Sequence, residues 1–429
     1  MKNLLILSIL VCIHYTASSQ FLMDMIDTTK DLGRGLLDIS RKYDHITISG
    51  YMQPQYQVAT SKGAAGNAFE GGSFGPYTDN RFRLRRGRIR FDYARFTVDS
   101  MPRLQFVFQF DGTEQGVNIR DFWGRVWESK WNKFSLTTGV FARPFGWEVN
   151  YSSSDREVPE RGRMSQLLLK TERDLGAMVT LLDRSKQAGF LKKIRVDFGI
   201  FNGQGLAAPA EVDSRKDFIG QIVLNPQKLS HSLTFSGGVS YLHGGIVQTH
   251  TSRYKFDAAQ KAMVESLTEG KGSYVPRRYS GANAQVQIRN VFGKTQLRGE
   301  WWWGIQPGLA NSSETAHLSQ DLPIYQRNFH GGFFYFLQDL GTPKTQLVLK
   351  YDYYNPNVDA GTEILQPAAH FTTADIAYHT YGAGILQHLT PNLKLFLFYS
   401  KPVNREIPGM GIEKDMDDEI ATCRLQFRF

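Results

Sequence analysis

Apolar and polar residues alternate along most of the chain, and the pattern is clearest at its C-terminal end. Within residues 422–429 every second side chain is apolar: Cys423, Leu425, Phe427 and Phe429. The residues between them are polar or cationic: Thr422, Arg424, Gln426 and Arg428. Because successive side chains of a strand point to opposite faces, this segment has one apolar face and one cationic face. Such a strand suits the wall of a membrane barrel, with lipid on one side and water on the other.

Similar alternating, aromatic-rich segments recur from Ile46 onward, separated by turn residues, and each predicts a strand. We expect about sixteen strands, an even number in the range of porins. The predicted strands are 46–58, 81–98, 103–111, 119–128, 134–142, 173–182, 193–202, 216–224, 231–243, 281–291, 295–303, 328–336, 344–354, 374–386, 392–400 and 419–429. The predicted fold class is therefore all-β, a transmembrane antiparallel β-barrel.

The connections between these strands alternate in length. Long, polar, Gly-rich connections are 59–80, 143–172, 203–215, 244–280, 304–327, 355–373 and 401–418, and short turns lie between them. Two connections depart from this alternation. The connection 112–118 is shorter than the other long connections, and the turn 183–192 is longer than the other short turns. Short periplasmic turns and long extracellular loops are typical of outer-membrane barrels, whereas a soluble sandwich has no reason to alternate in this way.

The N-terminal segment predicts export. Lys2 precedes an apolar run, 4–13, and the small residues Ala17, Ser18 and Ser19 follow it. This pattern predicts a signal peptide over 1–19, since the run is too short for a membrane span. Apolar residues at helical spacing over 22–39 predict a short amphipathic helix within a periplasmic extension, 20–45. The barrel then occupies 46–429, and we expect it in the outer membrane of a Gram-negative bacterium.

Composition agrees with a barrel and limits the chemistry. Mean hydropathy is −0.35 over 429 residues, as expected when only alternate residues face lipid, and 13% of residues are aromatic, as interfacial girdles require. The formal charge of +9 in an exported chain favours anionic solutes or lipopolysaccharide as partners over nucleic acid. Cys12 leaves with the signal, so Cys423 has no disulfide partner, and ten scattered histidines predict no metal site. We expect no cofactor.

The predicted strand 81–98 is the most charged. Its apolar parity switches around Arg86 and Gly87, where we expect a bulge that returns later arginines to the lumen. The resulting inward row contains Arg83, Arg85, Arg88 and Arg90. One interpretation is a series of weak sites for permeating anions. The alternative is that these arginines pair with carboxylates and only stiffen the wall.

Further cations have inward parity or lie in the loop 143–172. Arg120 and Arg125 share the predicted strand 119–128 with Asp121, Trp123 and Trp127. The loop and its end supply Arg143, Arg156, Arg161, Arg163, Lys170 and Arg173. This loop is long enough to fold into the lumen and narrow it, and its acidic residues make a mixed-charge constriction as plausible as a cationic one. A solvated surface loop is the alternative.

Three tryptophans end the predicted strand 295–303. Trp301 and Trp303 are predicted to face the outer aromatic girdle, and Trp302 the lumen, where a sugar-stacking platform is an alternative to simple packing. No Ser–His–Asp order or Gly-rich elbow supports an enzyme, so we expect none.

Several motifs resemble the phosphate-selective porin O and P family. They are the runs 139–148, 152–154, 160–161 and 172–178, together with 48–55, 82–92 and the terminal Phe429. The resemblance covers most of the mature chain. It implies a sixteen-stranded, typically trimeric outer-membrane barrel with an inward-folded third loop and a basic channel. At the matched positions it implies that Arg143, Arg161 and Arg173 line the channel.

The expected function is passive diffusion of small hydrophilic solutes, with a preference for anions such as phosphate. The predicted anion pathway is lined by Arg83, Arg85, Arg88, Arg90, Arg120, Arg143, Arg161 and Arg173. Two alternatives stay open. One is a general or sugar-selective porin, and the other is a non-conducting barrel whose loops 244–280 and 304–327 bind a partner.

Overall fold

The fold is that of a computed structural model. It describes residues 45–63, 69–97, 101–185, 189–206, 211, 213–266, 270–314, 321–361, 365, 369–406, 415–416 and 418–429. The predicted signal peptide and the amphipathic helix over 22–39 lie outside the described residues. Within the described residues, no helix is long and apolar enough to cross a membrane.

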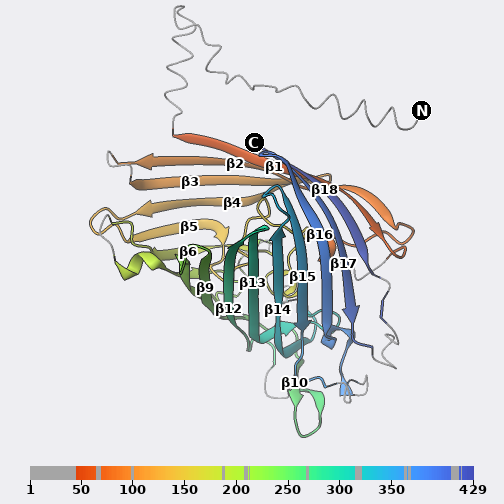
Figure 1. Cartoon of the computed structure of the whole chain (residues 1–429). Coiled ribbons are helices and arrows are strands. Elements are labelled where there is room, and N and C mark those ends of the chain that lie inside the picture. The colour runs from red at the N-terminus through yellow and green to blue at the C-terminus, as the bar shows by residue number, and fades with distance from the viewer. Residues whose placement is uncertain are drawn as a thin grey trace, which may run out of the picture. The chain divides into compact units, whose positions relative to one another are not determined.

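Sixteen strands form the wall of a closed barrel (Figure 1). They are β1 (Ile46–Ala59), β2 (Asn80–Phe96), β3 (Pro102–Thr113), β4 (Gly116–Trp127), β5 (Phe134–Ala142), β6 (Arg173–Leu181), β7 (Ile194–Phe201), β8 (Asp217–Lys228), β9 (Leu233–Val247), β12 (Tyr274–Asn290), β13 (Gly293–Gly308), β14 (Ile324–Asp339), β15 (Thr345–Asn355), β16 (Tyr378–Thr390), β17 (Leu393–Asn404) and β18 (Ile420–Arg428). Each strand pairs with the next, β9 pairs with β12, and β18 returns to pair antiparallel with β1. The barrel therefore has no free edge, and the predicted fold class and strand number are confirmed.

Two further strands lie outside the wall. β10 (Arg253–Asp257) and β11 (Ala262–Glu265) form a hairpin between β9 and β12, and β10 runs parallel to the start of β14. The hairpin falls in a segment that we predicted as a plain loop. Its strands are only five and four residues long, too short for their alternation to stand out in the sequence.

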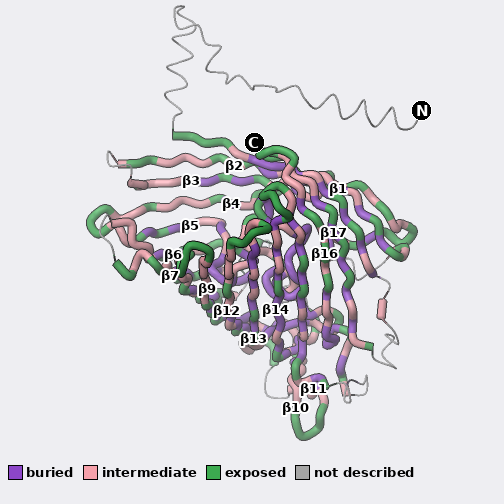
Figure 2. The backbone as a smooth tube through the Cα atoms, in the orientation of Figure 1, coloured by how far each residue is buried: buried purple, intermediate pink, exposed green. Residues whose placement is uncertain are grey.

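The two faces of the wall differ as the alternation predicts. On β18, Thr422, Arg424 and Gln426 are buried on the inner side, whereas Phe427 is exposed on the outer side. On β13, Trp301 and Trp303 are exposed and Trp302 is fully buried. Figure 2 shows buried and exposed positions alternating along the strands. The outer surface is thus largely apolar, as a lipid-facing wall requires.

The connections also follow the predicted alternation. β3 and β4 are joined by two residues only, 114–115, and the long turn between β6 and β7 contains the short helix η4 (Phe190–Lys193). The loop between β5 and β6, residues 143–172, contains the helix α3 (Arg163–Leu168). The connection between β15 and β16 ends in η6 (Thr373–Asp375).

The barrel interior is partly filled by apolar packing, which the sequence interpretation did not predict. Loop 143–172 contributes Phe145, Val149, Met164, Leu168 and Leu169 to one buried cluster with inward side chains of β5–β9 and β12–β15. Its Val158 joins a second cluster with inward side chains of β14–β17. Apolar side chains inside a barrel are stabilised when another apolar surface packs against them and excludes water, and here the loop provides that surface.

Candidate functional site

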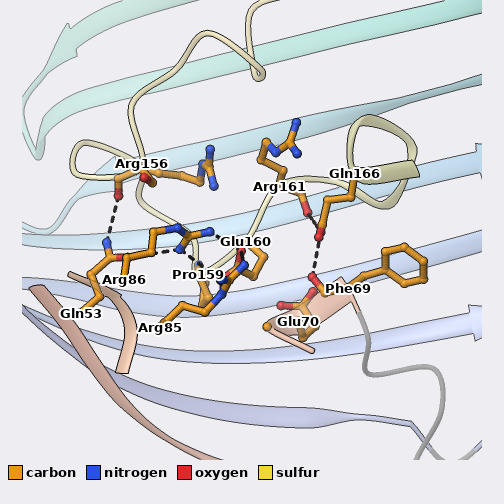
Figure 3. Close-up of polar contacts among 12 residues, drawn as sticks. Gln53, Phe69, Glu70, Arg85, Arg86, Arg156, Pro159, Glu160, Arg161 and Gln166 are labelled. Atoms are coloured by element: carbon orange, nitrogen blue, oxygen red, sulfur yellow. Dashed lines mark hydrogen bonds and ion pairs between the residues drawn. The ribbon is translucent and has the colours of Figure 1, made fainter. Parts of the chain in front are cut away.

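The strongest attachment of loop 143–172 to the wall is a carboxylate held by three arginines. Glu160 binds Arg85 Nε at 2.8 Å, Arg86 Nη2 at 2.6 Å and Arg424 Nη2 at 2.9 Å. Figure 3 shows Arg85 and Arg86 at this carboxylate. Burial by itself would raise the pKa of Glu160, but the three guanidinium groups hold it well below its usual range. The carboxylate therefore stays ionised, and it joins the loop to both β2 and β18.

A second attachment joins the start of the loop to β13 and β14. Glu300 accepts hydrogen bonds from the backbone N–H of Trp147 at 2.7 Å and of Glu148 at 2.9 Å. Glu148 in turn accepts from Tyr335 Oη at 2.7 Å and from Ser165 Oγ at 2.6 Å. These buried carboxylates satisfy loop backbone and side-chain donors that would otherwise lack partners in the interior.

Gly146 is needed beside this attachment. Its φ is +67°, and a Cβ there would lie 2.3 Å from Glu300 Oε1 and 2.8 Å from the Trp302 ring. The residue thus combines a left-handed backbone with a close approach that only glycine permits.

The middle of the loop reaches the opposite wall through three consecutive serines. Ser153 Oγ lies 2.6 Å from Tyr51 Oη and accepts from Arg88 Nη1 at 2.8 Å. The carbonyl of Ser154 accepts from Gln426 at 2.8 Å and from Lys394 at 2.9 Å. The loop is therefore fixed to β1, β2, β13, β14, β17 and β18, and it crosses the interior as the sequence predicts.

Five arginines of β2 have a carboxylate partner, whereas Arg81 donates to Gln57 Oε1 and to the carbonyls of Gly72 and Ser73. Arg83 pairs with Glu114 at 2.9 Å, Arg88 with Asp111 at 2.8 Å and Arg90 with Asp92 at 2.6 Å. Arg85 and Arg86 are adjacent in sequence, yet both reach Glu160. A regular strand would send them to opposite faces, so the expected switch of parity lies at this point. The contacts of Arg83, Arg85, Arg88 and Arg90 thus agree with the second interpretation, in which these arginines pair with carboxylates.

A second group of cations surrounds Glu172 at the end of the loop. Glu172 pairs with Arg120, with Arg161 at 3.1 Å and with Arg173 at 2.5 Å. Burial opposes its charge, and these arginines nevertheless lower the pKa of Glu172 well below its usual range. Arg173 also binds Asp121 at 3.0 Å. Cations and carboxylates are therefore mixed at this end of the loop.

Arg143 lies apart from this group. It is buried, hydrogen-bonded to the carbonyl of Thr171 and 3.9 Å from Asp174. Neither Arg143 nor Arg83 lines the three cavities described next. The other six predicted pathway residues each line at least one of them: Arg85, Arg88, Arg90, Arg120, Arg161 and Arg173.

Three neighbouring cavities remain between the loop and the wall formed by β1–β8. A cavity of about 370 Å³ is lined by Arg85, Arg120 and Lys170, and a second, also of about 370 Å³, by Tyr51, Ser153 and Arg428. A third, of about 320 Å³, is lined by Trp123, Trp127 and Arg184. All three share Arg173, and Arg88, Arg90 and Arg120 each line two of them. These arginines thus lie where the three cavities, which we call the polar path, adjoin along one side of the barrel.

The lining of this path is strongly cationic. Thirteen arginine or lysine side chains face six carboxylates. The cations are Arg85, Arg86, Arg88, Arg90, Arg120, Arg125, Lys133, Arg161, Lys170, Arg173, Arg184, Arg195 and Arg428. The carboxylates are Asp111, Asp121, Asp155, Glu160, Glu172 and Asp197. Cations thus outnumber carboxylates in the lining, while Arg90 and Lys170 pair with Asp92 and Glu314, which lie outside it.

Sequence reasoning missed the residues that fix the loop, but it placed Trp302 correctly on the inner face. Glu148, Glu160 and Glu300 were not identified as its attachment points, although the inward parity shared by Glu300 and Trp302 was a usable signal. The alternative of a sugar platform on Trp302 is wrong, because the ring is fully buried, packs edge-on against Phe145 with ring centroids 4.8 Å apart, and donates its N–H to Glu300.

A carboxyl in the first long loop makes the stability of the barrel depend on pH. Burial raises the pKa of Glu70 to about 7, and Ser400 Oγ is the one side-chain donor to its carboxylate among the described residues, at 3.0 Å. Because this pKa is higher than in the unfolded chain, the contribution of Glu70 is most favourable below about pH 4.5 and is lost as the pH rises through 7. Glu70→Gln should therefore raise the free energy of unfolding at pH 8 by up to about 3 kcal/mol and leave it unchanged at pH 4. Urea unfolding in detergent at both pH values measures this, and a variant less stable at both would contradict it.

The comparisons with known proteins concern the fold. No protein-family model and no curated protein matches the sequence. Among solved structures, the chain is similar to OprB of Pseudomonas putida, with a TM-score of 0.57 and 11% identity over 94% of this chain and 98% of that one. It is also similar to the outer-membrane channel DcaP of Acinetobacter baumannii, with a TM-score of 0.55 and 12% identity over 90% and 97%. It is similar as well to OmpT of Vibrio cholerae, with a TM-score of 0.50 and 9% identity over 90% of this chain and 97% of that one. These likenesses extend over nearly the whole of each chain and show a shared barrel fold.

Proposed function

We propose that this protein is an outer-membrane porin through which small hydrophilic solutes diffuse passively. The observation that carries the proposal is the chain of three polar cavities inside a closed, externally apolar barrel. A barrel of sixteen strands is wide enough for a channel, and here a fixed loop narrows it to one wall. One protein of similar fold, DcaP, is an outer-membrane channel. The chain would reach the membrane through a cleaved signal peptide over 1–19.

The proposal includes a preference for anions. Thirteen cations against six carboxylates give the path a positive potential, which raises the local concentration of anions and repels cations. A permeating anion would exchange part of its hydration for guanidinium N–H groups. Because Arg88, Arg120 and Arg173 already bind carboxylates, each contact would be shared and weak, which favours release. Phosphate is the solute that the family resemblance suggests, in a trimer surrounded by lipopolysaccharide.

The test is the reversal potential of single channels in planar bilayers across a KCl gradient. We expect chloride to carry most of the current, because cations predominate along the path. Equal permeability of the two ions would remove the anion preference and leave a general porin. Absence of channels from the refolded, heat-stable protein would overturn the porin function itself.

A further inference from the structure

The inner face of β4 alternates indole and guanidinium groups. Trp123, Arg125 and Trp127 point into the barrel, and the exposed Phe122 and Val126 point outward. The Arg125 guanidinium lies 5.0 Å from the ring centroid of Trp123 and 5.7 Å from that of Trp127. The series continues at both ends, with Arg90 6.0 Å from Trp123 and Arg184 5.8 Å from Trp127. All five residues of this series, which we call the indole–guanidinium stack, line the 320 Å³ cavity.

Arg125 and Arg184 differ from the other arginines of the path. Among the described residues, neither forms an ion pair with a carboxylate. Arg125 Nε donates to Thr137 Oγ1 at 2.7 Å, and Arg184 Nη2 donates to the carbonyl of Phe134 at 3.1 Å. Among carboxylates, Asp197 has the largest electrostatic effect on Arg125. Asp197 already forms an ion pair with Arg195 at 2.9 Å and accepts hydrogen bonds from Thr180 and Gln221.

Stacking on indole keeps these two cations available. A guanidinium that lies on an aromatic ring is held by its face, so its charge is not neutralised and its remaining N–H groups can bind a planar acceptor. Arg125 uses Nε for Thr137, and Arg184 uses Nε and Nη2 for the carbonyls of Asn132 and Phe134, which leaves other N–H groups of each guanidinium for a ligand. A carboxylate is such an acceptor, because its two oxygens match two parallel N–H groups. Arg125 and Arg184 therefore present positioned donors that no carboxylate of the described residues binds directly, whereas Arg88, Arg120 and Arg173 present donors already shared with a carboxylate.

The rest of the cavity lining is partly apolar. Phe141, Pro144, Met178 and Leu182 line it together with the two indoles. Contact between water and these apolar surfaces is unfavourable, and an inorganic anion bound here would leave them exposed to water. A solute that covers them with an apolar ring gains the burial of that surface in addition to its charge contacts.

We propose that the indole–guanidinium stack is a binding site for small organic anions that join a carboxylate to a flat apolar ring, that is, aromatic carboxylates. The carboxylate binds Arg125 and Arg184, and the ring lies along Trp127 and the apolar lining. This inference rests on the proposed function, since it places a dwell site for a permeating solute on the same path. It adds a solute class that neither the excess of cations nor the resemblance to phosphate-selective porins implies.

Calorimetric titration of the purified full chain in detergent tests the site without requiring conduction. Benzoate is the probe, phosphate is the anion without a ring, and benzamide is the ring without a charge. We expect benzoate to bind more tightly than either of the others. Arg125→Gln should weaken benzoate binding about tenfold, the effect of losing one charge-assisted hydrogen bond. Trp127→Leu should weaken benzoate binding and leave the weaker phosphate binding unchanged.

Two further variants protect the test against misfolding and non-specific charge effects. Arg184 lies outside the strands, so Arg184→Gln should fold normally, and it should also weaken benzoate binding. This variant tests the site if Arg125→Gln does not fold. Arg428→Gln removes an exposed cation that lines a neighbouring cavity, and it should leave the affinity for benzoate unchanged. Equal affinity for phosphate and benzoate, or unchanged benzoate affinity in Arg184→Gln and Trp127→Leu, would overturn the site.

The outcome is separable from that of the proposed function. If the channels conduct chloride but benzoate does not bind, the porin function stands and the aromatic-carboxylate site falls. If benzoate binds with the expected variant pattern but no channel conducts, the site stands as a binding site and passive diffusion falls.

Discussion

Glu160→Gln is expected to detach the centre of the third loop from the wall and to strengthen anion selectivity. Glu160 is the only acidic partner recorded for Arg85, Arg86 and Arg424 among the described residues. Removing its charge leaves three guanidinium groups close together without compensation. Breaking a buried ion pair by removing one partner costs about 3–5 kcal/mol, and here three pairs share that partner.

The physical response has two parts. The arginines would repel one another, and the loop would lose the contact that holds it to β2 and β18. Arg85 and Arg86 already line the path, so loss of the carboxylate adds net positive charge there. We expect a lower thermal unfolding midpoint in detergent, faster proteolysis within 143–172, and a reversal potential shifted further toward that of chloride.

A matched control lies in the same loop. Asp155 pairs with Arg428 at 3.2 Å, but both side chains are about half exposed, at 47% and 53%. Exposed pairs contribute about 0–1 kcal/mol, so Asp155→Asn should leave the unfolding midpoint nearly unchanged. Equal, small effects of the two variants would show that the three-arginine cluster does not hold the loop.

Replacing residues 147–170 with a short Gly-Ser linker is expected to prevent the formation of a stable barrel. A loop that acts only as a flap could be removed with no result beyond a wider channel. Here the removed residues include Val149, Val158, Met164, Leu168 and Leu169, all buried in the two interior clusters. At about 1.5–3 kcal/mol for each buried side chain, their loss amounts to something on the order of 10 kcal/mol as an upper estimate.

The remaining inward apolar side chains would then face water. Phe333, Val348, Leu386 and Phe396 pack around Val158 in the second cluster. We expect little folded protein after refolding into detergent, as measured by the thermal transition in circular dichroism. The control replaces 258–261, the exposed tip of the β10–β11 hairpin, and should fold normally. A deletion variant with unchanged thermal stability and larger conductance would show that the loop is a removable flap.

The sequence was most informative where structure depends on neighbouring residues. All sixteen wall strands were predicted, because alternation with period two is a local property that lipid on one side and the barrel interior on the other impose on every strand. β12 begins at Tyr274, seven residues before its predicted start at 281, because Pro276 and the glycines just before this segment look like a loop in the sequence. The β10–β11 hairpin was missed because much of its support comes from β14, far away in the chain.

The candidate site was predicted only in part. The parity of Arg88, Arg90, Arg120 and Arg173 follows from their own strands, so their inward direction could be expected. Arg125 was seen beside Trp123 and Trp127 but was not assigned to the pathway. Its distinction is that none of the described carboxylates forms an ion pair with it, and such a property is defined only once the neighbouring strands and loops are in place.

The sequence by itself thus determined the wall: which residues face outward, how many strands close the barrel, and that one loop is long enough to enter it. The tertiary structure decided the interior, namely that the loop packs as a core against β5–β9 and β12–β17, that Glu160 binds three arginines, and that the cavities lie beside β1–β8. The physical reason is range. Alternation is set by adjacent residues, whereas the pairing of a cation with a carboxylate, or of a loop valine with a distant wall, depends on residues more than a hundred positions apart, such as Glu160 and Arg424, which only the closed barrel brings together.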